Sequence, residues 1–344
     1  MYKKYLAVFC VVTCTCFYFW FYNSCSNHHP TELRAAIDIG SGATKMKIAE
    51  VDVKTQKIAS VIFEDQIAVA FQTQLSRSPD GTFDEVIMQE GIRAIQQLKE
   101  IAEKHQVNKV VAVATAAFRE AKNAQSYAKH ITEKTGVDVH IIDQEQEGIL
   151  AFNAAMANTE TNATDAVVWD IGGGSQQLTI KDENDGYYVC KGEIASISFR
   201  DHIIENLQGL NAKKHTTPNP IAGHVAQQAI DYAQVIGKRI DSSIQTKVQN
   251  PESTIFAVGS LFGYGIKSLV NDQTVVTQDL LKQAIDSLLD LGDDKLKGGE
   301  FANVTVSNAL LVLGTMKGLN IDQIIIQDVN NADGVLVLSH FYQS

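Results

Sequence analysis

The sequence predicts an α/β protein made of two related domains that face each other across a cleft. Three observations support this prediction. The chain has 344 residues, a length that suits two domains. Strand patterns alternate with helical patterns from residue 35 onward. One strand–turn–strand pattern containing Asp-Ile-Gly occurs twice. No long Pro-, Gly- or Ser-rich linker separates the two halves, so we expect them to touch.

The first half begins with a buried strand and its return strand, joined by a tight glycine turn. The strand patterns cover residues 35–38 and 44–53, and Gly40, Ser41 and Gly42 form the turn. Apolar residues at helical spacing then predict a helix over 85–105, and a second helical segment follows over 123–135. Apolar runs predict strands over 107–114 and 137–142.

The second half repeats this order with additional helices. A helix over 147–157 leads to a buried strand over 166–170, a turn at Gly172–Gly174 and a return strand over 176–181. The remaining expected elements are strands over 187–194, 254–258 and 321–327 and helices over 221–240, 278–291 and 304–317. Cys190 falls in an apolar-aromatic strand, where we expect a packed side chain rather than a nucleophile.

The two glycine turns offer a site for phosphate. Glycine has no Cβ, so the backbone N–H groups of such a turn can approach an anion closely. Asp38 and Asp170 end the strands before the turns, and a carboxylate in that place can hold Mg²⁺, which neutralises charge on a transferring phosphoryl group. Either turn alone is also typical of an ordinary β-hairpin, whereas the pair favours a phosphate clamp between two domains.

Two further clusters carry groups for phosphate chemistry. Arg119 and Thr115 lie where a strand gives way to a helix, and they could bind phosphate through the guanidinium and the hydroxyl. A surface ion pair is the alternative for Arg119. Asp143, Glu145 and Glu147 lie at the acidic start of a helix, and a carboxylate there could orient a water as general base. Acidic residues that merely complement the helix dipole are the alternative there.

Composition excludes some partners. The net charge is −11 and no long basic run is present, which argues against binding to double-stranded nucleic acid. A polyanionic substrate remains compatible, since a local basic groove is sufficient for it. Lys213, Lys214 and His215 could contact such a polyanion or form a solvated loop.

The N-terminal segment, residues 1–32, predicts export or anchoring. Residues 5–22 are almost wholly apolar, follow Lys3 and Lys4, and as a helix would span roughly 27 Å, about one bilayer core. The positive flank favours a body outside the cytoplasm, in the periplasm, held by an uncleaved anchor or released from a cleaved signal. A lipid-modified Cys25 is a third form of attachment, and a misassigned start codon would leave the protein cytoplasmic.

Four segments together resemble the Ppx/GppA family of exopolyphosphatases and guanosine pentaphosphate phosphohydrolases. They are residues 38–41, 114–123, 145–150 and 170–175, with looser matches at 257–260 and 333–334. The resemblance covers residues 34–338 and is to the short members with two domains. It implies duplicated actin-like ATPase domains of the ribonuclease H-like fold, over residues 33–146 and 147–344, with an interdomain cleft.

The resemblance also implies roles for individual residues. Glu147 matches a catalytic glutamate that orients the attacking water, and Arg119 matches an arginine that holds the phosphate chain. Asp170 matches a Mg²⁺-linked aspartate. The phosphate loops are matched by Asp38, Gly40, Ser41, Gly172, Gly173, Gly174 and Ser175.

The implied substrates are inorganic polyphosphate and pppGpp. Gln177 departs from the family, which has glutamate there, and an amide carries no charge for the metal. A non-catalytic polyphosphate or nucleotide sensor and a phosphotransferase of the same superfamily therefore stay as alternatives. The sequence does not decide the oligomeric state, and a homodimer stays open.

Overall fold

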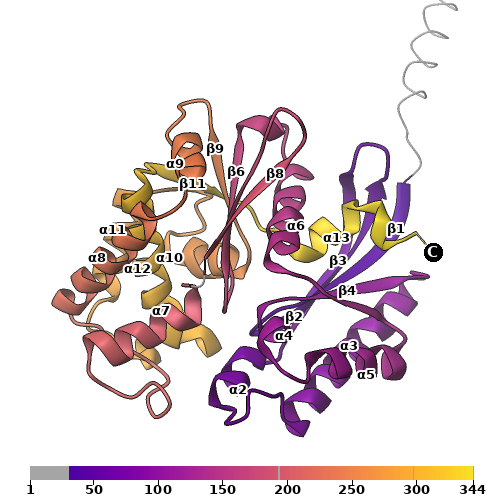
Figure 1. Cartoon of the computed structure of the whole chain (residues 1–344), viewed down its shortest axis with the longest axis horizontal. Helices are drawn as coiled ribbons and strands as arrows, with labels where there is room; N and C mark the ends of the chain where they lie inside the picture. The colour runs from indigo at the N-terminus through magenta and orange to yellow at the C-terminus, as the bar shows by residue number, and fades with distance from the viewer. Residues whose placement is uncertain (1–30, 193, 297, 344) are drawn as a thin grey trace, which may run out of the picture.

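The computed structural model describes residues 31–343, except 193 and 297. Figure 1 shows two lobes, each built on a central sheet, with helices packed on the sheets and between the lobes. The predicted α/β architecture with two related halves is confirmed.

The first sheet has five strands in the order β3-β2-β1-β4-β5. The first three strands are antiparallel neighbours, and β4 and β5 run parallel to β1. Their bounds are β1 Thr31–Ile39, β2 Ala43–Asp52, β3 Lys57–Ala68, β4 Val110–Ala114 and β5 Asp138–Ile141. Every residue of β4 is buried, because it lies in the middle of the sheet and both faces are covered by helices.

Two long helices cover the outer face of the first sheet. In α3 (Glu85–Lys104) the Asp84 side chain caps the first turn by accepting a hydrogen bond from the Ile87 N–H, and the apolar side faces the core. Beside it lies α5 (Ala124–Thr135). Two short helices, α2 (Phe71–Arg77) and α4 (Ala116–Glu120), extend this lobe toward the cleft.

The second sheet repeats the topology of the first and adds an edge strand. Its order is β10-β11-β9-β6-β7-β8. The antiparallel set β6-β7-β8 corresponds to β1-β2-β3, and β9 and β11 take the parallel places of β4 and β5. The bounds are β6 Ala166–Ile171, β7 Gln176–Lys181, β8 Tyr187–Gly192, β9 Thr254–Val258, β10 Val275–Thr277 and β11 Gln323–Ile326. Cys190 packs against this lobe's core from β8.

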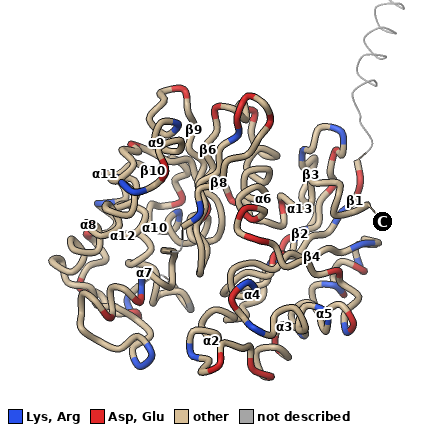
Figure 2. The backbone as a smooth tube through the Cα atoms, viewed as in Figure 1, with Lys and Arg blue, Asp and Glu red and all other residues tan. Residues whose placement is uncertain are grey.

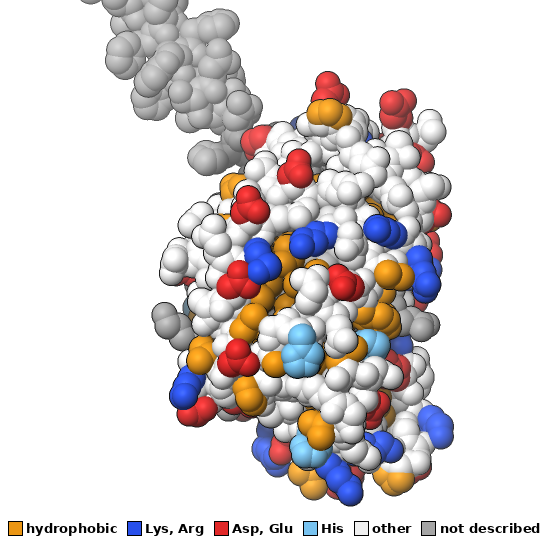
Figure 3. Space-filling model, turned by 90° about the vertical axis from the view of Figure 1, so that its left-hand side faces the viewer, with side chains coloured by type: hydrophobic (Ala, Val, Ile, Leu, Met, Phe, Trp, Pro, Cys, Tyr) orange, Lys and Arg blue, Asp and Glu red, His pale blue; other side chains and the backbone are white. Residues whose placement is uncertain are grey.

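The outer side of the second lobe is formed by helices around α12. This helix (Ala302–Leu319) is buried along nearly its whole length and packs against α8 (Gly223–Lys238). The other helices are α7 Ser196–His202, α9 Ser242–Val248, α10 Lys267–Leu269 and α11 Gln278–Leu288. Figure 3 shows this outer side with basic, acidic and apolar side chains interspersed.

Helices α6 and α13 lie between the two sheets and connect the lobes. The chain enters α6 (Gln144–Met156) from β5 of the first sheet, yet Phe152 and its neighbours pack on β6 and β9 of the second. The chain enters α13 (Asn331–Val337) after β11 of the second sheet, yet it packs on β1 and β2 of the first. The division of the chain at residues 146/147 stays a prediction, and that point falls inside α6.

The localisation prediction needs correction. We expected a membrane-anchored or exported protein with a periplasmic body, and this expectation is not supported, because none of the helices in residues 31–343 is both long and apolar enough to cross a bilayer. Residues 5–22, on which the expectation depended, lie outside the described residues.

Candidate active site

The two glycine turns meet in the cleft. The β1–β2 turn is closed by a hydrogen bond from Gly40 N–H to Ala43 O (3.0 Å), and the β6–β7 turn by the equivalent bond from Gly172 N–H to Ser175 O (2.8 Å). A Cβ built on Gly173 would lie only 2.8 Å from the Cβ of Ser41. The turns are therefore in contact, and glycine at position 173 is what allows them to approach so closely.

Buried carboxylates lie beside the turns. Asp38 and Asp170 end the central strands of the two sheets, and both are more than nine-tenths buried. Burial, together with the nearby charges of Glu147 and Asp38, raises the pKa of Asp170 to about 8. Burial also raises the pKa of Asp38, against the opposing charge of Lys45.

Gly259, which follows β9, lies against Asp170. Its φ is +87°, and a Cβ at this position would lie 2.6 Å from Asp170 Oδ1. A side chain would therefore be strained by the backbone and would displace the carboxylate. The looser sequence match at residues 257–260 thus marks a turn that shapes the carboxylate site.

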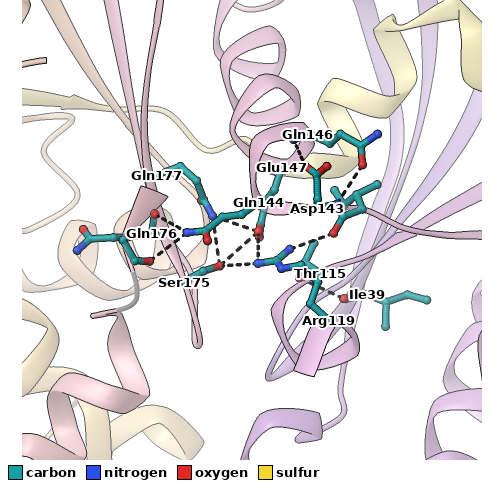
Figure 4. A network of polar contacts seen from close by, with 12 residues as sticks. Ile39, Thr115, Arg119, Asp143, Gln144, Gln146, Glu147, Ser175, Gln176 and Gln177 are labelled. Atoms are coloured by element: carbon teal, nitrogen blue, oxygen red, sulfur yellow. Dashed lines mark hydrogen bonds and ion pairs between the residues drawn. The ribbon is translucent and has the colours of Figure 1, made fainter. Parts of the chain in front are cut away.

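Glu147 is the centre of a polar network in the cleft (Figure 4). It lies in the first turn of α6, which begins with a capping box between Asp143 and Gln146. Its Oε2 receives Arg119 Nη2 at 2.7 Å, Gln177 Nε2 at 3.1 Å and Ser175 Oγ at 3.3 Å. Burial raises the pKa of Glu147, and the Arg119 charge opposes that shift.

Arg119 joins the first lobe to the β6–β7 turn. It lies in the short helix α4 directly after β4, and its Nη1 donates to Ile142 O at 3.2 Å. Its Nη2 donates to Ser175 Oγ at 3.0 Å in addition to Glu147. The guanidinium is only one-fifth exposed and its carboxylate partner is buried, so the surface ion pair considered for it is not what the fold forms.

Thr115 is close to the turns but faces away from Glu147. It is buried, and its hydroxyl lies 3.5 Å from Ile39 O, which is at the limit of a hydrogen bond. Figure 4 shows it behind the arginine, toward the β1–β2 turn. A role for Thr115 in binding phosphate stays a prediction.

Two polar residues of the site were not singled out as ligands from the sequence. Lys45 pairs with Asp38 across the β1–β2 hairpin, and its Nζ lies 3.9 Å from Asp38 Oδ2. The register of the hairpin could have revealed it. Gln177 was identified only as a departure from the family, whereas the structure shows its amide nitrogen donating to Glu147 and to Ser175 Oγ.

The buried carboxylates fit a divalent cation, although no group of three or more Asp, Glu, His or Cys side chains among the described residues forms a ready metal site. Asp38 Oδ1 is buried without a hydrogen-bond partner, and Asp38 raises the pKa of Asp170. A hard cation between the strand ends would give Asp38 Oδ1 a partner and would offset the repulsion between the two carboxylates. Phosphate oxygens and water would complete the coordination shell of the cation. Gln177 presents its nitrogen, not a carboxylate, to Glu147.

Two pockets open the cleft to solvent. The larger, about 460 Å³, is lined by Arg119, Gln144 and Gly173–Ser175 together with residues of α2 and α7. The smaller, about 290 Å³, lies between β2–β3 and the segments after β9 and β11, and Lys45 and Gly259 are among its lining residues. The larger opening thus reaches the β6–β7 turn, and the smaller one reaches Lys45 and Gly259, which lie beside Asp38 and Asp170.

The Ppx/GppA phosphatase family model matches residues 47–341, most of the chain. The chain belongs to the Ppx/GppA phosphatase family. The expected family relationship is therefore confirmed, and membership indicates a phosphatase, a hydrolase of phosphate bonds. The fold is the duplicated actin-like fold that the resemblance implied.

Solved structures agree with this fold. A Ppx/GppA family member from Aquifex aeolicus is 23% identical, with a TM-score of 0.67 over 90% of this chain and 97% of that chain. An exopolyphosphatase from Cytophaga hutchinsonii is 16% identical, with a TM-score of 0.70 over 90% and 98%. At these identities the likeness concerns the fold alone.

One curated relative carries the family's phosphatase name within a longer protein. A bifunctional 3-dehydroquinate synthase/phosphatase from Fusobacterium nucleatum is 24% identical over 153 residues, which is 43% of this chain. The match spans only 23% of that protein.

Proposed function

We propose that this Ppx/GppA family member hydrolyses the terminal phosphoanhydride of inorganic polyphosphate or of pppGpp. The observation that carries the proposal is the cluster of Glu147, Arg119 and Ser175 beside two glycine turns in contact. It combines a buried carboxylate, a cation and backbone donors, which are the groups needed to activate water and to hold a phosphoryl group.

The first step is exchange of partners at Arg119. Its Nη2 binds Glu147 and Ser175 Oγ in this structure, and a terminal phosphate competes for the same donor. Phosphate binding therefore frees the Glu147 carboxylate to accept a proton from water. The N–H groups of Gly173–Ser175, and of Ser41 and Gly42 in the β1–β2 turn, hold the remaining phosphate oxygens.

Water attack then follows in line. The water oxygen forms the new bond to phosphorus, its proton passes to Glu147, and the bridging oxygen leaves with its bonding electron pair. Asp170 and Asp38 would hold the Mg²⁺ on which phosphatases of this family generally depend, and Mg²⁺ supplies neutralisation of charge on the phosphates. Lys45, beside Asp38, adds a further positive charge on the first lobe.

One observation supports a second candidate, a non-catalytic sensor of phosphate chains. Gln177 donates to Glu147, where the family's glutamate would carry charge for a metal. A phosphotransferase is less well supported, because the Arg119 and Glu147 segments are those that resemble hydrolases.

The test is phosphate release from long-chain polyphosphate and from pppGpp, with and without Mg²⁺, and with ADP as a possible acceptor. Release of inorganic phosphate that needs Glu147 supports the hydrolase. Binding without release would identify a sensor, and transfer to ADP would identify a phosphotransferase.

A further inference from the structure

The smaller opening of the cleft carries more carboxylates than free cations. Its charged lining residues are Lys45, Lys47, Glu64, Asp65 and Asp328. Lys47 Nζ binds buried Asp333 at 2.8 Å and lies 3.5 Å from Glu64, while Lys45 lies 3.9 Å from Asp38. Both lysines therefore already have carboxylate partners.

Carboxylates also outnumber cations among the residues that line the larger opening. Its charged lining residues are Arg119, Glu120 and Asp201. Arg119 is bound to Glu147. Glu120 accepts a hydrogen bond from Gln72 at 2.8 Å, and Asp201 is paired with Arg200 at 2.6 Å. Among the described residues that line either opening, each cation lies near a carboxylate, and several carboxylates face the space between the lobes.

This distribution disfavours a long polyanion. Long-chain polyphosphate adds about one negative charge per phosphate, and a groove that binds such a polymer needs a row of cations that outnumber its carboxylates. In Figure 2 acidic and basic residues are interspersed along the described chain, and no element there carries a continuous basic row. Beyond the phosphates held at the turns, a long chain meets carboxylates whichever opening it leaves by.

We propose that the cleft selects substrates with a short anionic part: a triphosphate or tetraphosphate, or a short phosphoanhydride tail on an uncharged organic group. The length of phosphate chain that is accepted is limited by Glu64, Asp65 and Asp328 at one opening and by Glu120 at the other. This inference rests on the proposed hydrolase function and narrows its substrate class.

The first experiment needs only the wild-type chain. The value of kcat/KM per chain end is measured for tripolyphosphate and for long-chain polyphosphate over a series of salt concentrations. We expect tripolyphosphate to be preferred at low salt and the preference to shrink as salt rises, because screening weakens repulsion between exposed charges. Equal kcat/KM values at low salt, or a preference for the long chain, would overturn the proposal.

Variants at each opening then locate the barrier. Glu64→Gln/Asp328→Asn removes two negative charges at one opening and Glu120→Gln removes one at the other, with Glu90→Gln/Glu100→Gln and Glu90→Gln on the outer helix α3 as the controls of equal charge. At the opening through which the phosphate chain leaves, the substitution should raise kcat/KM for the long chain by about threefold per carboxylate removed. The value of kcat/KM for tripolyphosphate should stay within about twofold of wild type.

The outcomes distinguish a failure of the length limit from a failure of the proposed hydrolase function. A ratio of long-chain to tripolyphosphate turnover that stays unchanged in both cleft variants, or that rises equally in the matched α3 control, would refute the length limit. If the wild-type chain released phosphate from neither substrate nor from pppGpp, the hydrolase proposal itself would fail.

Discussion

Replacing Glu147 by Gln tests the role of the buried carboxylate most directly. The amide keeps an acceptor for Arg119 Nη2 and Gln177 Nε2, which lie 2.7 and 3.1 Å from Glu147 Oε2, but it cannot take a proton from water. Loss of a general base lowers the rate by about 10²–10⁴-fold, so we expect kcat to fall by that factor.

Substrate affinity should move in the opposite direction. In the wild-type chain a terminal phosphate must compete with Glu147 for Arg119, whose side chain is only 20% exposed. Hydrogen bonds between charged groups contribute about 1.5–3 kcal/mol, and the lower figure corresponds to roughly tenfold in Kd. We therefore expect Glu147→Gln to bind a non-hydrolysed phosphate analogue more tightly, by up to about that factor.

The assays are phosphate release under saturating substrate and calorimetric titration with the analogue. Glu145→Gln is the matched control, because Glu145 lies in the same helical turn, is exposed, and pairs with Lys191 at 2.9 Å outside the network. The melting temperature of Glu147→Gln is measured alongside, because the substitution leaves the Arg119 charge without its carboxylate partner and binding is compared only for a folded variant. Turnover near that of wild type, or weaker binding of the analogue in a stable variant, would refute the assigned role.

Three other substitutions test the surroundings of this carboxylate. Gln177→Glu places a second carboxylate about where an amide nitrogen now lies 3.1 Å from Glu147 Oε2, so activity should reach half of its maximum at a lower Mg²⁺ concentration. An unchanged magnesium titration would show that this side chain does not influence the cation. Gly173→Ala puts a Cβ 2.8 Å from Ser41 Cβ and should separate the turns, lowering kcat/KM on the order of 10²-fold in a folded protein; wild-type kinetics would show that their contact is dispensable. Asp170 holds its proton in the folded, metal-free chain up to about pH 8 but releases it near 3.8 when unfolded, so thermal stability should fall as pH rises between these values, and Asp170→Asn should flatten that slope. Melting temperatures measured without metal from pH 4 to 8 check this, and an identical slope in the variant would contradict the assignment.

The sequence by itself determined the features that depend on neighbouring residues along the chain. The two Asp-Ile-Gly turns, their flanking strands and the period of the long helices were all predicted, because glycine conformation, burial and helical spacing are local properties. Several elements were missed for local reasons too, among them β3, α13 and the short helices α2, α7 and α9. Strand β3 is largely exposed and shows no clean alternation, and α13 is a short helix in the loosely matching C-terminal segment. The N-terminal apolar run suggested a membrane location that no helix of the described residues supports.

Only the tertiary structure decided which of these groups meet. Arg119 and Ser175 are 56 residues apart and meet because the lobes face each other, whereas Lys47 and Asp333 are 286 apart and meet because α13 packs back on the first sheet. The packing of α6 and α13 between the sheets sets that arrangement. Gln177 also illustrates the difference: the sequence identified a missing charge, whereas the fold shows a donor directed at Glu147. Sequence spacing carries no information about contacts across a cleft, because these depend on how two independently formed sheets are held against each other.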